Sequence, residues 1–133
     1  MSAYAVRFHN LAQARETKRF SEKHAVAIEL VTAEHMPHAY GVGPIYAMEQ
    51  KLGWHIWVDV GAYPGIALAA IRMGLKHVLF SGDPRVAPKL EDMLNQVGGT
   101  LKKQLGLPEI ELEFGEDAEV RLASYLGKDG GSV

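Results

Sequence analysis

The chain contains no cysteine, few aromatic side chains and no strong excess of either charge. Without cysteine it forms no disulfide, holds no metal through thiolates and has no thiol nucleophile. Its 14 Lys and Arg side chains nearly balance its 16 Asp and Glu side chains, which gives a net charge of -2 at pH 7. This balance argues against a nucleic-acid-binding protein, because such proteins carry a basic stripe that releases counterions from the phosphates.

The sequence also lacks a long uninterrupted apolar run. The longest apolar stretch, 62–75, contains Pro64, Gly65 and Arg72 and is too short to cross a bilayer. The N-terminal residues 1–7 include no basic stretch followed by a long apolar segment, so they do not resemble a signal peptide. We therefore expect a cytoplasmic protein with no membrane partner.

What is present is typical of one globular domain. The chain has 133 residues, of which 47% are hydrophobic and 23% charged, and two halves of this length would each bury a poor core. We predict a single domain over residues 1–126. Residues 127–133 are rich in glycine and predict a flexible tail.

Two kinds of segment alternate along the chain. Short segments rich in Val, Ile and aromatic residues predict strands, and longer segments with apolar residues three and four apart predict helices. The predicted strands are 3–8, 25–32, 55–60, 76–80 and 109–114. The predicted helices are 11–23, 43–52, 64–73, 84–97 and 117–126. Asn10 and Asp83 are the predicted N-caps of the first and fourth helices, and residues 33–42 are predicted to be a loop.

This alternation predicts an α/β fold, flavodoxin-like or Rossmann-like. We expect a single three-layer domain with a mainly parallel sheet of about five strands, right-handed crossovers and helices on both faces. Residues 109–114 alternate strictly, with Ile110, Leu112 and Phe114 on a buried face and glutamates on the other. The glutamates discourage further pairing, so this last strand is predicted at an edge of the sheet.

The length and the order of elements resemble those of a response-regulator receiver domain. In that family an aspartate that ends the third strand accepts a phosphoryl group, and Asp59 and Ser81 occupy matching positions here. The family also has an acidic pair after the first strand, where this chain has His9 and Asn10, and a lysine after the fifth, where this chain has none. The resemblance therefore implies the fold and not phosphorylation.

In open α/β sheets, ligands bind beyond the carboxyl ends of the strands. We therefore predict that a small ligand, with an anion as one option, binds the residues that follow the predicted strands. His24, His55 and His77 precede or begin strands, so we place them at the opposite end and outside the site. The predicted ligand-binding residues are Asn10, Glu34, His35, His38, Tyr40, Gly41, Gly43, Gly61, Ser81, Gly82 and Asp83. The same residue types also form ordinary turns and caps, which is the alternative interpretation.

The segment 33–44 is the most unusual of these loops. It opens a predicted helix, and backbone amides at such a start can hold an anion. Gly41 and Gly43 lack the remainder of a nucleotide-binding fingerprint, so the alternative is a connector that needs glycine for its conformation. His35 and His38 could join His9 around a zinc ion, but their spacing matches no metal-binding signature. We predict no metal site and leave any cofactor open.

Asp59 and His9 are the candidate catalytic residues. Asp59 ends a buried strand, a position that suits a general acid or base, although it could instead cap the loop that follows. Proton transfer by Asp59 or His9, in a lyase or isomerase, is our second hypothesis. A nucleophilic serine is not expected, because no serine lies in a Gly-x-Ser-x-Gly pattern.

The third hypothesis is a structural or regulatory subunit that acts by homo-oligomerisation. Gly65, Ala69 and Met73 recur four residues apart in a predicted helix. With Ala62, Ala67 and Ala70 nearby, the small side chains of this segment let a helix approach a second copy closely, which predicts a homodimer. Packing on the chain's own sheet is the alternative. The sequence leaves the ligand, the reaction and the oligomeric state open.

Overall fold

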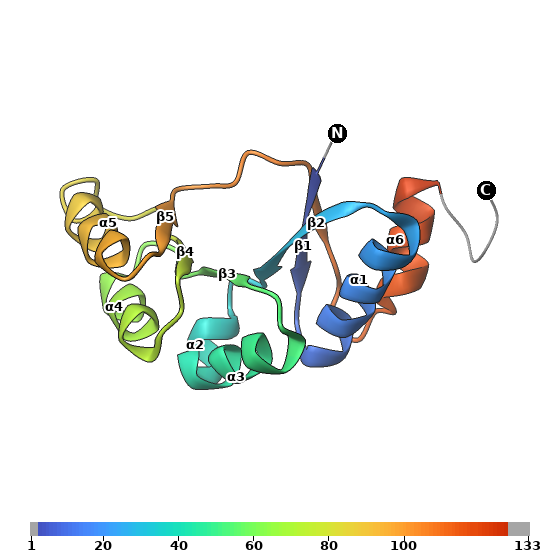
Figure 1. Ribbon diagram of the computed structural model, residues 1–133, viewed down its shortest axis with the longest axis horizontal. Coiled ribbons are helices and arrows are strands. Elements are labelled where there is room, and N and C mark those ends of the chain that lie inside the picture. Colours follow the sequence, from blue (N-terminus) through green and yellow to red (C-terminus); the bar gives the residue numbers. More distant parts are fainter. Residues whose placement is uncertain (1–2, 128–133) are drawn as a thin grey trace. The chain divides into compact units, whose positions relative to one another are not determined.

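The computed structural model describes residues 3–127, which fall into two compact units (Figure 1). Of the described residues, the first unit combines 3–30 with 107–127, and the second comprises 31–106. The single domain over 1–126 stays a prediction. Of the predicted tail, Gly127 caps the last helix with a φ of 69°, and residues 128–133 lie outside the described residues.

The predicted α/β fold with a mainly parallel sheet is confirmed, with six strands rather than about five. It is of the flavodoxin-like or Rossmann-like type. Strand β2 (Ala27–Thr32) contributes its first part to the first unit and its last part to the second. The other elements of the first unit are β1 (Ala3–Phe8), α1 (Leu11–His24), β6 (Glu109–Glu111) and α6 (Ala118–Leu126). Within residues 3–127, no helix is both long and apolar enough to cross a membrane.

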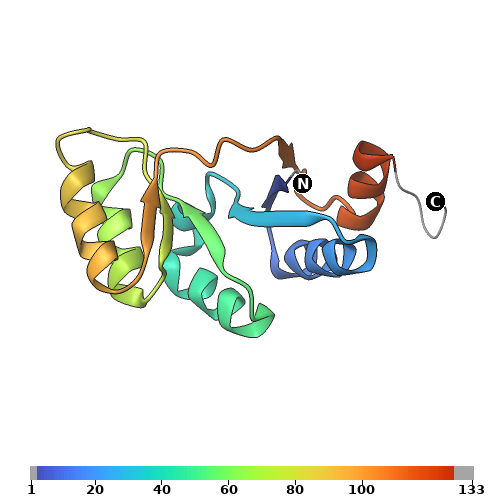
Figure 2. The same cartoon turned by 45° about the horizontal axis from the view of Figure 1, so that its top comes forward.

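In the first unit β1 lies between β2 and β6. Val6 is in register with Ile110 in the parallel pair β1–β6, and α1 and α6 lie side by side (Figure 2). Asn10 is confirmed as the N-cap of α1, because its Oδ1 accepts a hydrogen bond of 2.8 Å from the Gln13 amide. The Gln13 side chain donates to the carbonyls of Glu113 and Glu116, which ties α1 to the turn after β6.

The predicted edge position of the last strand is confirmed, since β6 ends the strand order. Ile110 and Leu112 are buried as predicted, but Phe114 is 71% exposed, so its predicted burial is wrong. The reason is a turn that ends the strand early. The amide of Glu116 donates to the carbonyl of Glu113, and the amide of Glu113 donates to Oε1 of Glu116.

In the second unit the strand order is β5-β4-β3-β2, and β3 pairs in parallel with β4 and β4 with β5. Helices α3, α4 and α5 pack next to one another in chain order (Figure 1). The core contains large apolar side chains from both strands and helices. The elements of this unit are α2 (Met36–Tyr40), α3 (Val42–Leu52), β3 (Ile56–Asp59), α4 (Pro64–Met73), β4 (His77–Leu79), α5 (Ala87–Gln96) and β5 (Thr100–Lys102).

Two predictions for this unit are wrong, and one strand was missed. The predicted loop 33–42 contains helix α2, because Pro37 suits the first turn of a helix. Asp83 is not the N-cap of α5: its Oδ1 accepts the Arg85 amide in a turn, and the helix begins three residues later than predicted. Strand β5 was not predicted, since it is only three residues long and mostly exposed.

Candidate functional site

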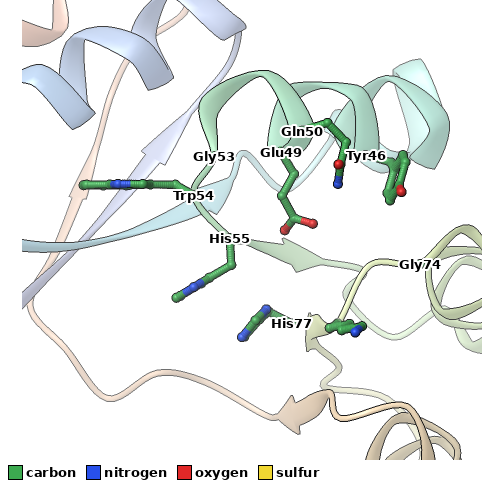
Figure 3. Close-up of a pocket in the computed structure, with 9 residues that line it drawn as sticks. Tyr46, Glu49, Gln50, Gly53, Trp54, His55, Gly74 and His77 are labelled. Atoms are coloured by element: carbon green, nitrogen blue, oxygen red, sulfur yellow. The ribbon is translucent and has the colours of Figure 1, made fainter.

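A pocket of about 450 Å³ opens at the amino ends of β3 and β4 in the second unit (Figure 3). Each of these strands starts where the preceding helix has just ended, so the two helix–strand turns meet there. The pocket combines ring-bearing and ionisable side chains. It is lined by Tyr46, Glu49, Gln50, Gly53, Trp54, His55, Gly74, Lys76 and His77.

Two glycines shape the turns that form the pocket. Gly53 ends α3 in the left-handed conformation, with its amide donating to the Glu49 carbonyl. Gly74 ends α4 with a φ of 107°, and a Cβ placed on it would stand 3.2 Å from Cε1 of Tyr46. The absence of a side chain at residue 74 therefore lets the Tyr46 ring lie close against the end of α4.

Glu49 connects the last turn of α3 to the start of β3. Its Oε2 accepts a hydrogen bond of 2.8 Å from the Ile56 amide, and its carboxyl group points toward His55 and His77 (Figure 3). Among the residues that the structure describes, none donates a hydrogen bond to the other carboxyl oxygen of Glu49, Oε1. Burial raises the pKa of Glu49, while the Ile56 amide and the positive charges of His55 and Lys76 act in the opposite direction. The Glu49 carboxyl group is therefore easier to protonate than that of an exposed glutamate.

The imidazoles of His55 and His77 form a stacked pair, with ring centroids 4.1 Å apart and planes inclined by 18°. The parallel register of β3 and β4 pairs Val58 with Val78 and so brings Trp57 beside His77, with centroids 4.9 Å apart. The Lys102 ammonium lies 5.5 Å from the Trp57 ring centroid. One wall of the pocket is therefore backed by a continuous layer of rings.

Within residues 3–127, no three His, Asp or Glu side chains are grouped in a way that could hold a metal ion. In the stacked pair the two imidazole rings lie nearly face to face, so they do not direct their nitrogens at one point. The side chains that line the pocket offer hydrogen bonding, ring stacking, charge and proton transfer.

The residues predicted to follow the first strand lie in the first unit. Nε2 of His9 is 2.7 Å from the Leu112 carbonyl oxygen, and the His9 amide donates to Oε1 of Gln13. Asn10 caps α1. Both residues thus take part in holding the first unit together, and the proton-transfer role of His9 stays a prediction.

The other predicted residues lie in the second unit, and some of them meet. Oδ1 of Asp59 accepts the Gly61 amide at 2.9 Å, which is the capping alternative considered from the sequence. The Ser81 amide donates to the Gly61 carbonyl, and a Cβ on Gly82 would stand 2.7 Å from the Ala62 carbonyl oxygen. The turns after β3 and β4 are therefore packed closely together.

Asp83 forms its strongest interactions within its own turn. The Arg85 guanidinium donates to both carboxylate oxygens of Asp83, at 3.1 and 2.9 Å. The side-chain hydrogen bond from Arg85, with a smaller contribution from the Arg85 amide, lowers the pKa of Asp83. This pair accounts for the position of Asp83 without a ligand.

The residues around α2 are mostly exposed. Glu34, His35, His38 and Tyr40 all lie at the surface, and the His38 ring meets the Tyr63 ring edge to face at 4.4 Å. Gly41 separates α2 from α3 with a φ of 77°, and Gly43 lies in the first turn of α3. Ligand binding by these residues stays a prediction.

Two of the histidines that were predicted to lie outside the site, His55 and His77, line the pocket. His55 immediately precedes β3, and His77 is the first residue of β4. Neighbouring parallel strands bring residues at the same distance from their starts together, so two histidines at the starts of consecutive strands were the signal in the sequence. Glu49 carried no such signal, because its position depends on how α3 packs.

No protein-family model matches the chain, and no curated protein matches its sequence.

Proposed function

We propose that this protein binds a small polar molecule in the pocket at the amino ends of β3 and β4. The observation that carries the proposal is the convergence of Glu49, His55, Lys76 and His77 on one concave volume of about 450 Å³. Small-molecule sites are typically clefts of about 300–1,000 Å³ with a few convergent polar groups. A titratable residue with a shifted pKa in such a cleft, as Glu49 is, further supports a functional role.

The carboxyl ends of the strands are a less favoured location for the ligand. There Asp59 and Asp83 use their carboxylates to hold their own turns, whereas Glu49 keeps one oxygen without a hydrogen bond among the described residues. The small ligand predicted from the sequence is retained, and the proposed location moves to the opposite end of the strands.

Proton transfer is a second candidate function, and the raised pKa of Glu49 favours it. A carboxyl group whose pKa lies closer to neutrality is a better general acid or base. His55 and His77 line the same pocket and could exchange protons with it. Glu49 and the imidazoles would then take the roles that the sequence assigned to Asp59 and His9. Homo-oligomerisation, the third hypothesis, stays a prediction that light scattering would test.

A screen by nuclear magnetic resonance tests the proposed pocket. We expect saturable shifts of the Trp54 indole and the Gly53 and Ile56 amides on addition of small carboxylates, phosphates, amines or nucleosides. A variant with both His55→Ala and His77→Ala should lose these shifts. His24→Ala is the matched control, because His24 contacts the Phe20 ring in the first unit. Saturable shifts only at Gly61 and Ser81 would favour the carboxyl ends instead, and no saturable shift at all would overturn the proposal.

A further inference from the structure

Basic side chains outnumber acidic ones around the pocket. Lys76, His55 and His77 line it, and Glu49 is the only carboxylate among its lining residues. Helix α3 also contributes Tyr46, and the turn after α4 contributes Gly74. When Glu49 is protonated, the positive charge of Lys76 is left without a carboxylate in the pocket.

The C-termini of α3 and α4 oppose this positive charge. A helix end carries about half a negative charge, and its effect is reduced by capping and by solvent. Here the last carbonyls accept the amides of Gly53 and Gly74. Two such ends amount to roughly one negative charge. The Lys76 ammonium offsets this charge, so the helix ends do not leave the pocket net negative when Glu49 is neutral.

Aromatic and imidazole rings also line the pocket. Tyr46 and Trp54 contribute their rings in addition to the stacked pair of His55 and His77. Aromatic rings attract one another at centroid separations of about 4.5–7 Å. A volume of about 450 Å³ accommodates a single substituted ring.

Building on the proposed function, we infer that the ligand is a small aromatic acid. Its carboxylate would lie near Lys76 and the imidazoles, and its ring would pack against the aromatic lining. A protonated Glu49 would donate a hydrogen bond from its carboxyl group to the ligand carboxylate.

Protonation of Glu49 is coupled to binding in this arrangement. An ionised Glu49 repels an anion, whereas a neutral one donates to it. Because burial already raises the pKa of Glu49, the neutral form persists to higher pH than for an exposed glutamate. Binding of an anion therefore takes up a proton, and affinity falls as the pH rises.

Four probes distinguish the contribution of the ligand's charge from that of its aromatic ring: benzoate, benzylamine, acetate and inorganic phosphate. Their dissociation constants are measured from the shifts of Gly53, Trp54 and Ile56 at about pH 5, just above the ordinary pKa of a glutamate, and at about pH 8. We expect benzoate to bind most tightly and to weaken at the higher pH. Lys76→Gln should weaken benzoate binding about tenfold, the effect of losing one charge-assisted hydrogen bond. Lys51→Gln, an exposed lysine of α3 outside the lining, should leave it unchanged.

Glu49→Gln tests the proton coupling. The glutamine amide donates at every pH, so benzoate binding should persist in this variant with a smaller loss between about pH 5 and about pH 8. An unchanged pH dependence in the variant would overturn the coupling. Tighter binding of benzylamine than of benzoate would overturn the acidic ligand while leaving the proposed function in place. Equal binding of benzoate and acetate would overturn the aromatic ligand, and no binding of any probe would overturn both proposals.

Discussion

Glu49 has a structural and an ionisable role at the same time. Its Oε2 accepts the amide that begins β3, while its carboxyl group lies at a pocket where burial disfavours the charged form. An amide side chain would satisfy the Ile56 amide without the cost of burying charge. The presence of a carboxyl group at this position is therefore better explained by chemistry at the pocket than by the connection to β3 alone.

The stability of Glu49→Gln should depend on pH with a defined sign. The pKa of Glu49 is raised in the folded state, so this group's contribution is most favourable below the ordinary value of 4.5 and falls as the pH rises through the raised pKa. Gln keeps an acceptor for the Ile56 amide and removes that loss. We expect the difference in melting temperature between the variant and the original protein to shift in favour of the variant from about pH 4 to about pH 7. A shift of this difference in favour of the original protein would contradict the raised pKa.

Asn10 provides a residue-scale test in the first unit. Its side chain caps α1 by accepting the Gln13 amide, and an N-cap Asn→Ala change costs about 1 kcal/mol. We expect Asn10→Ala to lower the free energy of unfolding in urea by that amount and Asn10→Asp to restore it. Asn95→Ala, at an exposed position in α5, is the control. A loss of similar size in the control would show that capping is not the cause.

At the scale of elements, β5 is held against β4 by close backbone packing. The Thr100 amide donates to the Lys76 carbonyl at 2.7 Å. A Cβ on Gly99 would stand only 2.7 Å from that carbonyl oxygen and equally close to Cδ2 of Leu94. The three residues of β5 therefore depend on a glycine that immediately precedes them.

Gly99→Ala should consequently destabilise the protein by about 1–3 kcal/mol, the usual cost of forcing an extra methyl group into a packed site. Gly65→Ala is its matched control, because that glycine lies in α4 with no atom within 4 Å of an added Cβ. There the change should stabilise by up to about 1 kcal/mol. Urea unfolding of both variants measures the difference. Equal effects in the two would mean that the space around Gly99 relaxes without cost.

The sequence predicted elements well where local chemistry alone determines them. Helix α1 begins as predicted because Asn10 caps it, and α4 lies over 64–73 as predicted because Pro64 starts it and Gly74 ends it. Where a local pattern allowed two outcomes, the prediction was wrong. The Asp83–Pro84 pair is typical of a helix start, but the Asp83 side chain bonds to Arg85 in a turn instead.

The site was harder to predict than the fold. The general rule for open sheets directs attention to the carboxyl ends of the strands, while the pocket lies at their amino ends. That pocket exists because the Tyr46 ring packs on Gly74 and because Glu49 reaches the Ile56 amide. Both contacts join α3 to residues of other elements, and periodicity in one sequence does not reveal them.

At the scale of the whole molecule, the first unit is closed by residues distant in sequence. Segments 3–30 and 107–127 build it, and residues 31–106 separate them. The parallel pair β1–β6 joins the two segments, with Ala5 opposite Glu109 and Arg7 opposite Glu111. The Arg7 guanidinium adds a hydrogen bond of 2.6 Å to Oε1 of Glu109. Closing so long an intervening segment costs chain entropy, which the buried contacts of β6 must offset.

Ile110 should therefore be a sensitive position in the first unit. It is 1% exposed and in register with Val6, and replacing a buried isoleucine by alanine costs about 2–5 kcal/mol. In Ile110→Ala we expect faster hydrogen exchange at the amides of Val6 and Leu112. The amides of the second unit should lose less protection, because the pairing of β6 lies within the first unit. Glu111→Ala, at the exposed neighbouring position, should change little. Equal loss of protection in both units would show instead that the chain unfolds as one cooperative body.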